Sequence, residues 1–307
     1  MNDFTVKGCL TAVMVVFALS TSAQAGGAQG MEYSGSVGSF SNDAIGDGRD
    51  RWQSASYQRS FIFDKNDAGM MQQIELRGRA QIVSPWTSSR QEQDRPYSSV
   101  LGFGAFAHGD LIGLESHVGG EIVVQGDHTG LPAFQSGAHD FLGLDKSYDP
   151  ENTSDEHVSD RVTVRGEAGL AKSFRPFEGV LFRPYGFIAI GADESATIGM
   201  DVVLGSLAQS SSWTRDHVTG QLLTHQADTK EGFSFVAGID ATRVLSSMHI
   251  PEESAVAPEV TQTRARIGAQ LYVGAADVFF GQTWLSEGFV GQSDTQRVGT
   301  LSVSFNF

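Results

Sequence analysis

The chain contains one cysteine, few charged residues and no long apolar run. Cys9 is the single cysteine among 307 residues, which excludes an internal disulfide framework and a thiolate metal site. Acidic residues exceed basic residues by 36 − 21 = 15, and this charge disfavours nucleic acid as a partner because its phosphates repel an acidic surface. After Leu19, no segment approaches the roughly 18 consecutive apolar residues that a transmembrane helix requires.

The first 25 residues have the plan of a secretory signal. Lys7 precedes an apolar run from Cys9 to Leu19, and the small residues of Ala23-Gln24-Ala25 stand before Gly26. The run is too short to span a bilayer, which takes about 20 residues. We therefore predict a signal peptide over residues 1–25 and one mature domain over 26–307. Any metal in that domain must be bound by oxygen or imidazole ligands.

Glycine and a period-two alternation are what the sequence has in abundance. There are 36 glycines and 20 phenylalanines, a composition that favours β-structure with tight turns. Residues 74–82, 162–171 and 264–273 each alternate apolar side chains with charged or polar ones. Charged residues at mid-strand are typical of a membrane barrel with a polar lumen. The last residues, 301–307, alternate strictly and end on Phe307, which resembles the terminal strand of bacterial outer-membrane barrels.

The alternation predicts an all-β fold: a transmembrane antiparallel β-barrel of twelve strands in a bacterial outer membrane. The segments are 31–39, 54–63, 73–82, 98–107, 111–125, 160–171, 180–190, 195–204, 231–242, 263–273, 276–286 and 297–307. Bacterial barrels of this kind have an even number of strands. With both termini periplasmic, the long connection 126–159 is extracellular, and its residues 131–144 predict a short helix. The connection 205–230 is periplasmic and unusually long, so it is either an exception or a sign that the strand count is wrong nearby.

Three outward connections carry residues suited to chemistry: 126–159, 40–53 and 83–97, the last of which ends in Asp94-Arg95-Pro96-Tyr97. Gln135 and His139 are four residues apart and would share a helix face. The connection 40–53 contains Asn42, Asp43 and Asp50, whose oxygen atoms suit a hard cation such as Ca²⁺.

These residues form an ordered series that resembles the lipid A 3′-O-deacylases, the LpxR family of outer-membrane barrels. The series consists of Asn42-Asp43, Asp50-Arg51-Trp52-Gln53-Ser54, Asp94-Arg95-Pro96-Tyr97, Gln135-x-x-x-His139 and Phe289-x-Gly291-Gln292. Gln53, Ser54 and Asp145 stand where the family has tyrosine, threonine and glutamate, and Glu287 is displaced by one position.

The resemblance implies a calcium-dependent esterase that removes 3′-linked acyl chains of lipid A at the outer rim of the barrel. It assigns the base to His139, positioning of the base or substrate to Gln135, the site hydroxyl to Ser54 and a supporting carboxylate to Asp145. Asn42 and Asp43 would help to bind Ca²⁺. Arg95 could contact a lipid A phosphate, because guanidinium and phosphate groups match in geometry. The expected partners are lipopolysaccharide and outer-membrane lipid, and the chain is expected to be a monomer.

Two other function classes stay open from the sequence. One is a diverged or catalytically inactive barrel that acts as a scaffold, and the other is a diffusion pore, whose lumen would here be crowded by Arg, Glu and Gln. An outer-membrane phospholipase of the serine type is disfavoured, because no His-x-Ser pair followed by Asn lies in a suitable strand.

Overall fold

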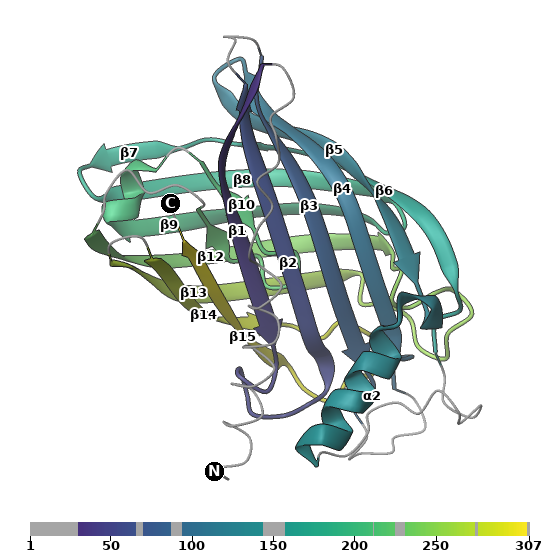
Figure 1. Ribbon diagram of the computed structural model, residues 1–307. Coiled ribbons are helices and arrows are strands. Elements are labelled where there is room, and N and C mark those ends of the chain that lie inside the picture. Colours follow the sequence, from purple (N-terminus) through teal and green to yellow (C-terminus); the bar gives the residue numbers. More distant parts are fainter. Residues whose placement is uncertain are drawn as a thin grey trace.

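Period-two alternation produces twelve long antiparallel strands. The computed structural model describes residues 30–65, 70–86, 94–143, 157–210, 212–224, 231–273 and 276–305, and the predicted signal peptide lies outside them. The barrel strands, shown in Figure 1, are β1 (Met31–Asn42), β2 (Trp52–Lys65), β3 (Met71–Ser84), β4 (Ser98–Leu111), β5 (Leu114–Gln125), β6 (Arg161–Ala171), β8 (Val180–Gly191), β9 (Glu194–Gly205), β12 (Glu231–Ser246), β13 (Thr261–Val273), β14 (Ala276–Leu285) and β15 (Gln296–Phe305).

The strands close into a ring. The first and last strands pair, with Ser39 opposite Ser302, and β6 pairs with β8, with Ala168 opposite Ile188. A short additional strand, β7 (Phe174–Phe177), pairs with the start of β8. Each of the twelve expected segments overlaps one barrel strand, so the predicted fold and strand number are confirmed.

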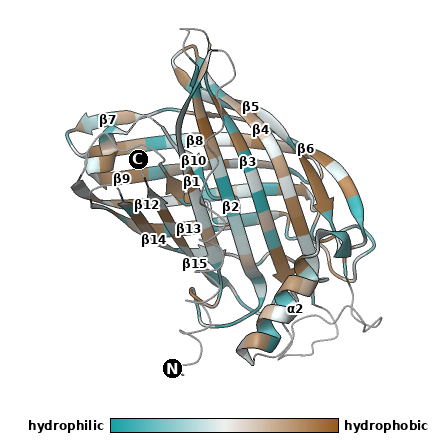
Figure 2. Cartoon of the chain, in the orientation of Figure 1, coloured by the Kyte–Doolittle hydropathy of each residue, from teal (hydrophilic) through white to brown (hydrophobic). Residues whose placement is uncertain are grey.

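Apolar side chains face outwards and polar side chains face the lumen. On β6, Val162 and Val164 are exposed on the outer surface, whereas Arg165 between Val164 and Gly166 is buried on the lumen side. Figure 2 shows the same alternation of brown and teal along the strands. A closed ring with an apolar outer surface satisfies every backbone hydrogen bond within a bilayer. The chain is therefore an outer-membrane barrel. Among the described residues, no helix is long and apolar enough to cross a membrane.

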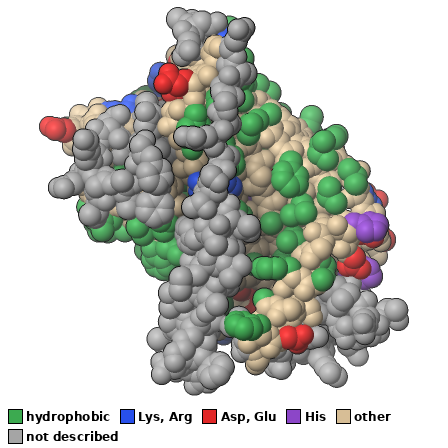
Figure 3. Space-filling view, viewed as in Figure 1, with side chains coloured by type: hydrophobic (Ala, Val, Ile, Leu, Met, Phe, Trp, Pro, Cys, Tyr) green, Lys and Arg blue, Asp and Glu red, His purple; other side chains and the backbone are tan. Residues whose placement is uncertain are grey.

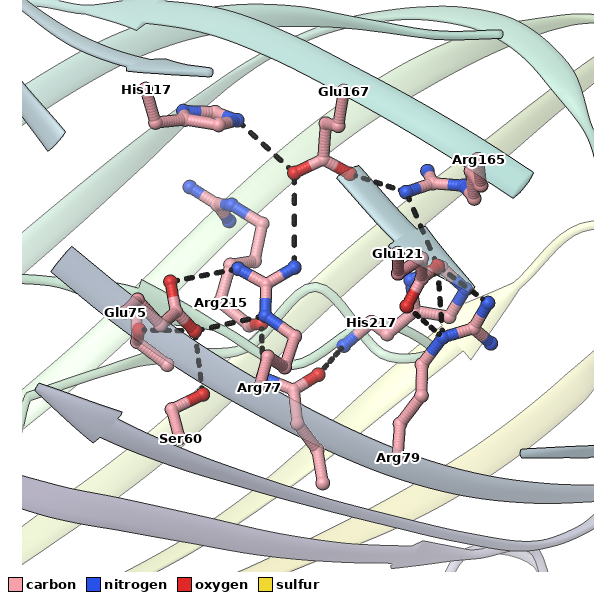
Figure 4. A network of polar contacts seen from close by, with 12 residues as sticks. Ser60, Glu75, Arg77, Arg79, His117, Glu121, Arg165, Glu167, Arg215 and His217 are labelled. Carbon is pink, nitrogen blue, oxygen red and sulfur yellow. Dashed lines mark hydrogen bonds and ion pairs between the residues drawn. The ribbon is translucent and has the colours of Figure 1, made fainter. Parts of the chain in front are cut away.

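Ion pairs fill much of the lumen. Arg79 Nη2 lies 2.7 Å from Glu121 Oε1, and Arg165 Nη1 lies 2.8 Å from Glu167 Oε2. Figure 4 shows these pairs beside Arg215 and His217 of a segment that lies inside the barrel. Pairing of this kind compensates the cost of removing charge from bulk water. The mid-strand charges in the alternating pattern are thus lumen ion pairs, as expected.

The segment inside the barrel is the long periplasmic connection. It contains η2 (Ser206–Gln209), β10 (Thr214–Arg215) and β11 (Leu222–Leu223), and we call residues 206–224 the plug. Asp216 of the plug accepts hydrogen bonds from Ser39 Oγ on β1 at 2.6 Å and from Thr219 Oγ1 at 2.7 Å. Leu207, Leu222 and Leu223 join an apolar cluster with side chains of the barrel wall. The length of this connection is therefore a true exception, and the strand count is right.

The predicted extracellular helix is α2 (Leu131–Leu142), which follows the short helix η1 (Asp127–Thr129). Gly130 before it has φ +71°, proline stands in its first turn, and Gly143 ends it with φ +65°. Leu131 packs against Ile82 and Tyr97. Ile82 lies on the outward row of β3, so α2 covers the outside of the barrel wall at its extracellular end.

Candidate active site on the outer wall

The candidate site lies between α2 and the outer surface of the barrel, at the extracellular ends of β1, β2 and β3. Ser39 and Ser41 of β1 bond to Asp216 in the lumen, so Asn42, with the opposite parity, faces outwards. Its side-chain amide donates to the carbonyl of Ser54, and its Oδ1 accepts from the backbone N–H of Ala44 at 2.6 Å.

An irregularity at the start of β2 turns Ser54 towards the same surface. Trp52 has a positive φ of 55°, and the register between β2 and β3 shifts between Trp52 and Ala55. Gln53 consequently faces the lumen, where its Oε1 accepts from Gln81 Nε2 at 2.9 Å. The Ser54 hydroxyl instead meets the hydroxyl of Ser84 at the outer end of β3. A local bulge thus decides which of two adjacent polar side chains reaches the site.

Gln135 and His139 share the barrel-facing side of α2, as their spacing predicts. Both side chains are buried. Gln135 Oε1 accepts a hydrogen bond from the Tyr97 hydroxyl at 2.8 Å. His139 Nε2 lies 3.4 Å from Asp50 Oδ2, in the connection between β1 and β2. Both predicted catalytic residues of the helix therefore contact side chains of other outward connections.

Asp43 has a buried carboxylate, and one of its oxygens has no hydrogen-bond partner among the described residues. Its Oδ2 accepts from the backbone N–H of Arg51 at 2.6 Å and from Gln296 Nε2 at 3.2 Å. Its Oδ1 has no hydrogen-bond partner among the described residues. Burial, with the nearby charges of Asp50 and Asp47, raises the pKa of Asp43 well above its usual range.

The oxygen atoms at and beside Asp43 are of the type that binds Ca²⁺. Oδ1 of Asp43 and the amide oxygen of Asn42 are hard ligands. A cation would also offset the repulsion between the carboxylates of Asp43, Asp47 and Asp50. In the part of the chain that the structure describes, no three His, Cys, Asp or Glu side chains converge as a metal-ligand set. A calcium ion here would therefore draw on amide and backbone oxygens and on water as well as on carboxylate. The residues present fit such a site.

An aromatic cluster supports the connection that carries Asp43 and Asp50. The guanidinium of the buried Arg51 lies 4.1 Å from the centre of the Trp52 ring and 4.7 Å from that of Trp86. Phe289 packs edge-on against Trp52 with ring centres 6.1 Å apart. Asp94 accepts from Trp52 Nε1 at 3.3 Å and from the backbone N–H of Trp86 at 2.7 Å. Three of the sequence motifs thus meet in one structural support.

Two predicted site residues are not brought to the outer wall by the described structure. Arg95 is buried and lines a lumen cavity of about 370 Å³, together with His249 and Gly288. Burial lowers the pKa of Arg95 to about 10, and its Nε has no hydrogen-bond partner among the described residues. Asp145 lies outside the described residues.

The fold resembles that of LpxR from Salmonella typhimurium. The two structures match with a TM-score of 0.74 and 18% sequence identity, over 89% of this chain and 100% of LpxR. Matches to the β domain of the Bordetella autotransporter BrkA (TM-score 0.41, 9% identity, 91% of this chain and 100% of that one) and to the Pseudomonas putida toluene transporter TodX (0.34, 9%, 92% and 90%) are much weaker. No protein-family model and no curated protein matches the sequence.

The likeness to LpxR concerns the whole barrel, and it agrees with the family resemblance of the sequence motifs. The geometry adds contacts that the sequence did not predict: Asp50 faces His139, Tyr97 bonds Gln135, and Ser84 meets Ser54. Asp50 and Tyr97 belong to motifs that the sequence already displayed. Ser84 carries no recognisable pattern of its own.

Proposed function

We propose that the chain is a calcium-dependent outer-membrane esterase that hydrolyses the 3′-linked acyl chains of lipid A. The observation that carries this proposal is the seating of α2 on the outer wall, where Gln135 bonds to Tyr97 and His139 faces Asp50. Asp50 belongs to the connection that also carries Asp43 and that runs between Asn42 and Ser54, which bond to each other. The outer surface of a barrel is where the acyl chains of a membrane lipid lie. A site for a soluble substrate would more naturally open into the lumen or above the loops.

His139 would act as the general base. The Asp50 carboxylate near Nε2 favours the tautomer protonated on that nitrogen, so Nδ1 is the atom that accepts the proton of the attacking water. The water oxygen bonds to the ester carbonyl carbon and the bond from that carbon to the sugar oxygen breaks. The proton held on Nδ1 passes to the sugar oxygen, so that a fatty acid and a sugar hydroxyl are released. A calcium ion bound by Asn42 and Asp43 would supply positive charge opposite the developing oxyanion. Gln135, fixed by Tyr97, would orient His139 or the ester.

The remaining predicted residues would play smaller parts. The Ser54 hydroxyl would stand in for the site threonine of the family, and Asp145 would supply the supporting carboxylate. A phosphate contact by Arg95 requires the lipid A headgroup to extend over the rim towards the mouth of the lumen, because Arg95 lines the lumen cavity.

Mass spectrometry of lipid A from a Gram-negative host tests the proposal. The host would express the wild type, His139→Ala or His128→Ala, each with added Ca²⁺ or with a chelator. His128 is an exposed histidine of the same connection, so it is the matched control. We expect loss of the 3′-linked acyl chains with the wild type and His128→Ala in Ca²⁺, and unchanged lipid A with His139→Ala or chelator. Unchanged lipid A in every sample, with the barrel shown to be folded, would instead support an inactive scaffold.

A further inference from the structure

Helix α2 presents two large apolar side chains that nothing in the described structure covers. Phe134 is 57% exposed and Phe141 is 80% exposed. They are seven residues apart, two helical turns, and so lie on one face. Gln135 and His139 are buried against the barrel and lie on another side of the helix. Phe134 is about 100° around the helix axis from Gln135, and Phe141 is about 160° from His139. The exposed polar residue Asp140 points to a different side of the helix.

The position of α2 places its exposed apolar face beside the outer surface of the barrel. The helix packs through Leu131 onto Ile82, on the outward row of β3. Further along the same outer surface, Leu76 of β3 is 46% exposed and Phe103 of β4 is 61% exposed. These two side chains belong to the apolar surface that faces lipid in a membrane barrel. In Figure 3, hydrophobic side chains cover the strands above α2 and occur again on α2 itself. The apolar face of α2 is thus continuous with the lipid-facing surface.

We propose that α2 is an interfacial helix whose Phe134 and Phe141 insert among the acyl chains of the outer leaflet. An amphipathic helix that lies at the boundary of headgroups and acyl chains buries its apolar face in this way. Insertion of these side chains holds α2, and with it Gln135 and His139, at the depth of the acyl chains, and so guides an acyl chain of the substrate towards the site. The insertion follows from the exposed face alone, and the guidance of substrate rests on the proposed esterase function. Phe134 and Phe141 are therefore positioning residues.

Spin labels test the insertion without reference to activity. Phe134→Cys, Phe141→Cys and Asp140→Cys would be labelled with a nitroxide in the mature chain, since Cys9 lies in the predicted signal peptide. The labelled proteins would be reconstituted in vesicles of phosphatidylethanolamine and phosphatidylglycerol. Collision with oxygen, which concentrates in lipid, is compared with collision with a water-soluble nickel chelate. We expect the labels at 134 and 141 to favour oxygen several-fold over the label at 140. Equal access to the chelate at all three positions would overturn the insertion.

A second measurement tests the guidance of substrate. Phe134→Ser with Phe141→Ser should raise the apparent KM for lipid A in vesicles about tenfold or more, with a smaller change in kcat, because the catalytic groups remain. Ala133→Ser, an exposed position on another side of α2, is the matched control. Unchanged KM in the double variant would overturn the guidance. If the wild type does not deacylate lipid A, the esterase proposal fails, and the spin-label result still decides the insertion.

Discussion

His139 Nε2 lies 3.4 Å from Asp50 Oδ2, and this contact joins the helix of one outward connection to a carboxylate of another. Since Asp50 is partly exposed, its pairing with His139 should add little to stability. We expect Asp50→Asn to leave the unfolding temperature nearly unchanged and to lower kcat roughly tenfold, which equals about 1.4 kcal/mol of barrier. Steady-state kinetics on lipid A with parallel thermal unfolding checks this. If Asp50→Asn deacylates lipid A at the wild-type rate, Asp50 has no part in the reaction.

Arg51 and Arg49 allow a matched comparison within the same connection. The side chain of Arg51 is 1% exposed and stacks on Trp52 and Trp86. That of Arg49 is 48% exposed, pairs with Asp294 and lies farther from the Trp86 ring centre, at 5.7 Å. Lysine cannot reproduce the planar stacking of a guanidinium. Arg51→Lys should therefore cost about 1–2 kcal/mol in the free energy of unfolding. It should also weaken Ca²⁺ binding, because loss of the stacking loosens the connection in which the backbone N–H of residue 51 bonds to Asp43. Arg49→Lys should change neither quantity. Unfolding in denaturant measures the stability and calcium titration measures the binding. Equal values for the two variants would contradict the role given to Arg51.

His249 makes the stability of the barrel depend on pH. Burial, with the charges of Arg95 and Arg79, holds its pKa well below the usual range, and its Nδ1 lies 2.9 Å from the Ser98 hydroxyl. The folded state keeps His249 neutral while the unfolded state takes up a proton below about pH 6.5, so stability is lost as the pH falls through that value. The loss is at most about 1.4 kcal/mol for each pH unit. His249→Gln should flatten the dependence measured by denaturant unfolding between pH 7 and 5, and His128→Gln should not. An unchanged slope in His249→Gln would refute this assignment.

Asp216 holds the plug in the lumen. Its carboxylate accepts from Ser39 Oγ, Thr219 Oγ1 and the backbone N–H groups of Val218 and Thr219, all buried. Asp216→Ala leaves these donors without an acceptor, at about 1–3 kcal/mol for each buried group. We expect the wild type to show little conductance in a planar bilayer and Asp216→Ala to open intermittently. Gln209→Ala, at an exposed position of the plug, should behave like the wild type. Steady conductance of the wild type would instead favour a diffusion pore as the function of the chain.

The sequence by itself determined the strands and the composition of the two barrel surfaces. Alternation is a local property, because successive side chains of a strand point to opposite faces, and so residues such as Val164 and Arg165 could be assigned to lipid and lumen. The spacing of Gln135 and His139 likewise fixed their common helix face, and Gly143 marked the end of the helix.

Only the tertiary structure decided on which side of the wall each candidate site residue lies. The motifs named Ser54, Asn42 and Arg95 as site residues, and Gln53 stands directly before Ser54. The register shift after Trp52 sends Gln53 to the lumen and Ser54 to the outer wall. Arg95 lines the lumen cavity, and Asp50 meets His139 across two separate connections. The plug is likewise invisible in the local pattern, because its polar residues find their partners on β1, β14 and β15. Such contacts depend on residues far apart in the chain, which local periodicity does not encode.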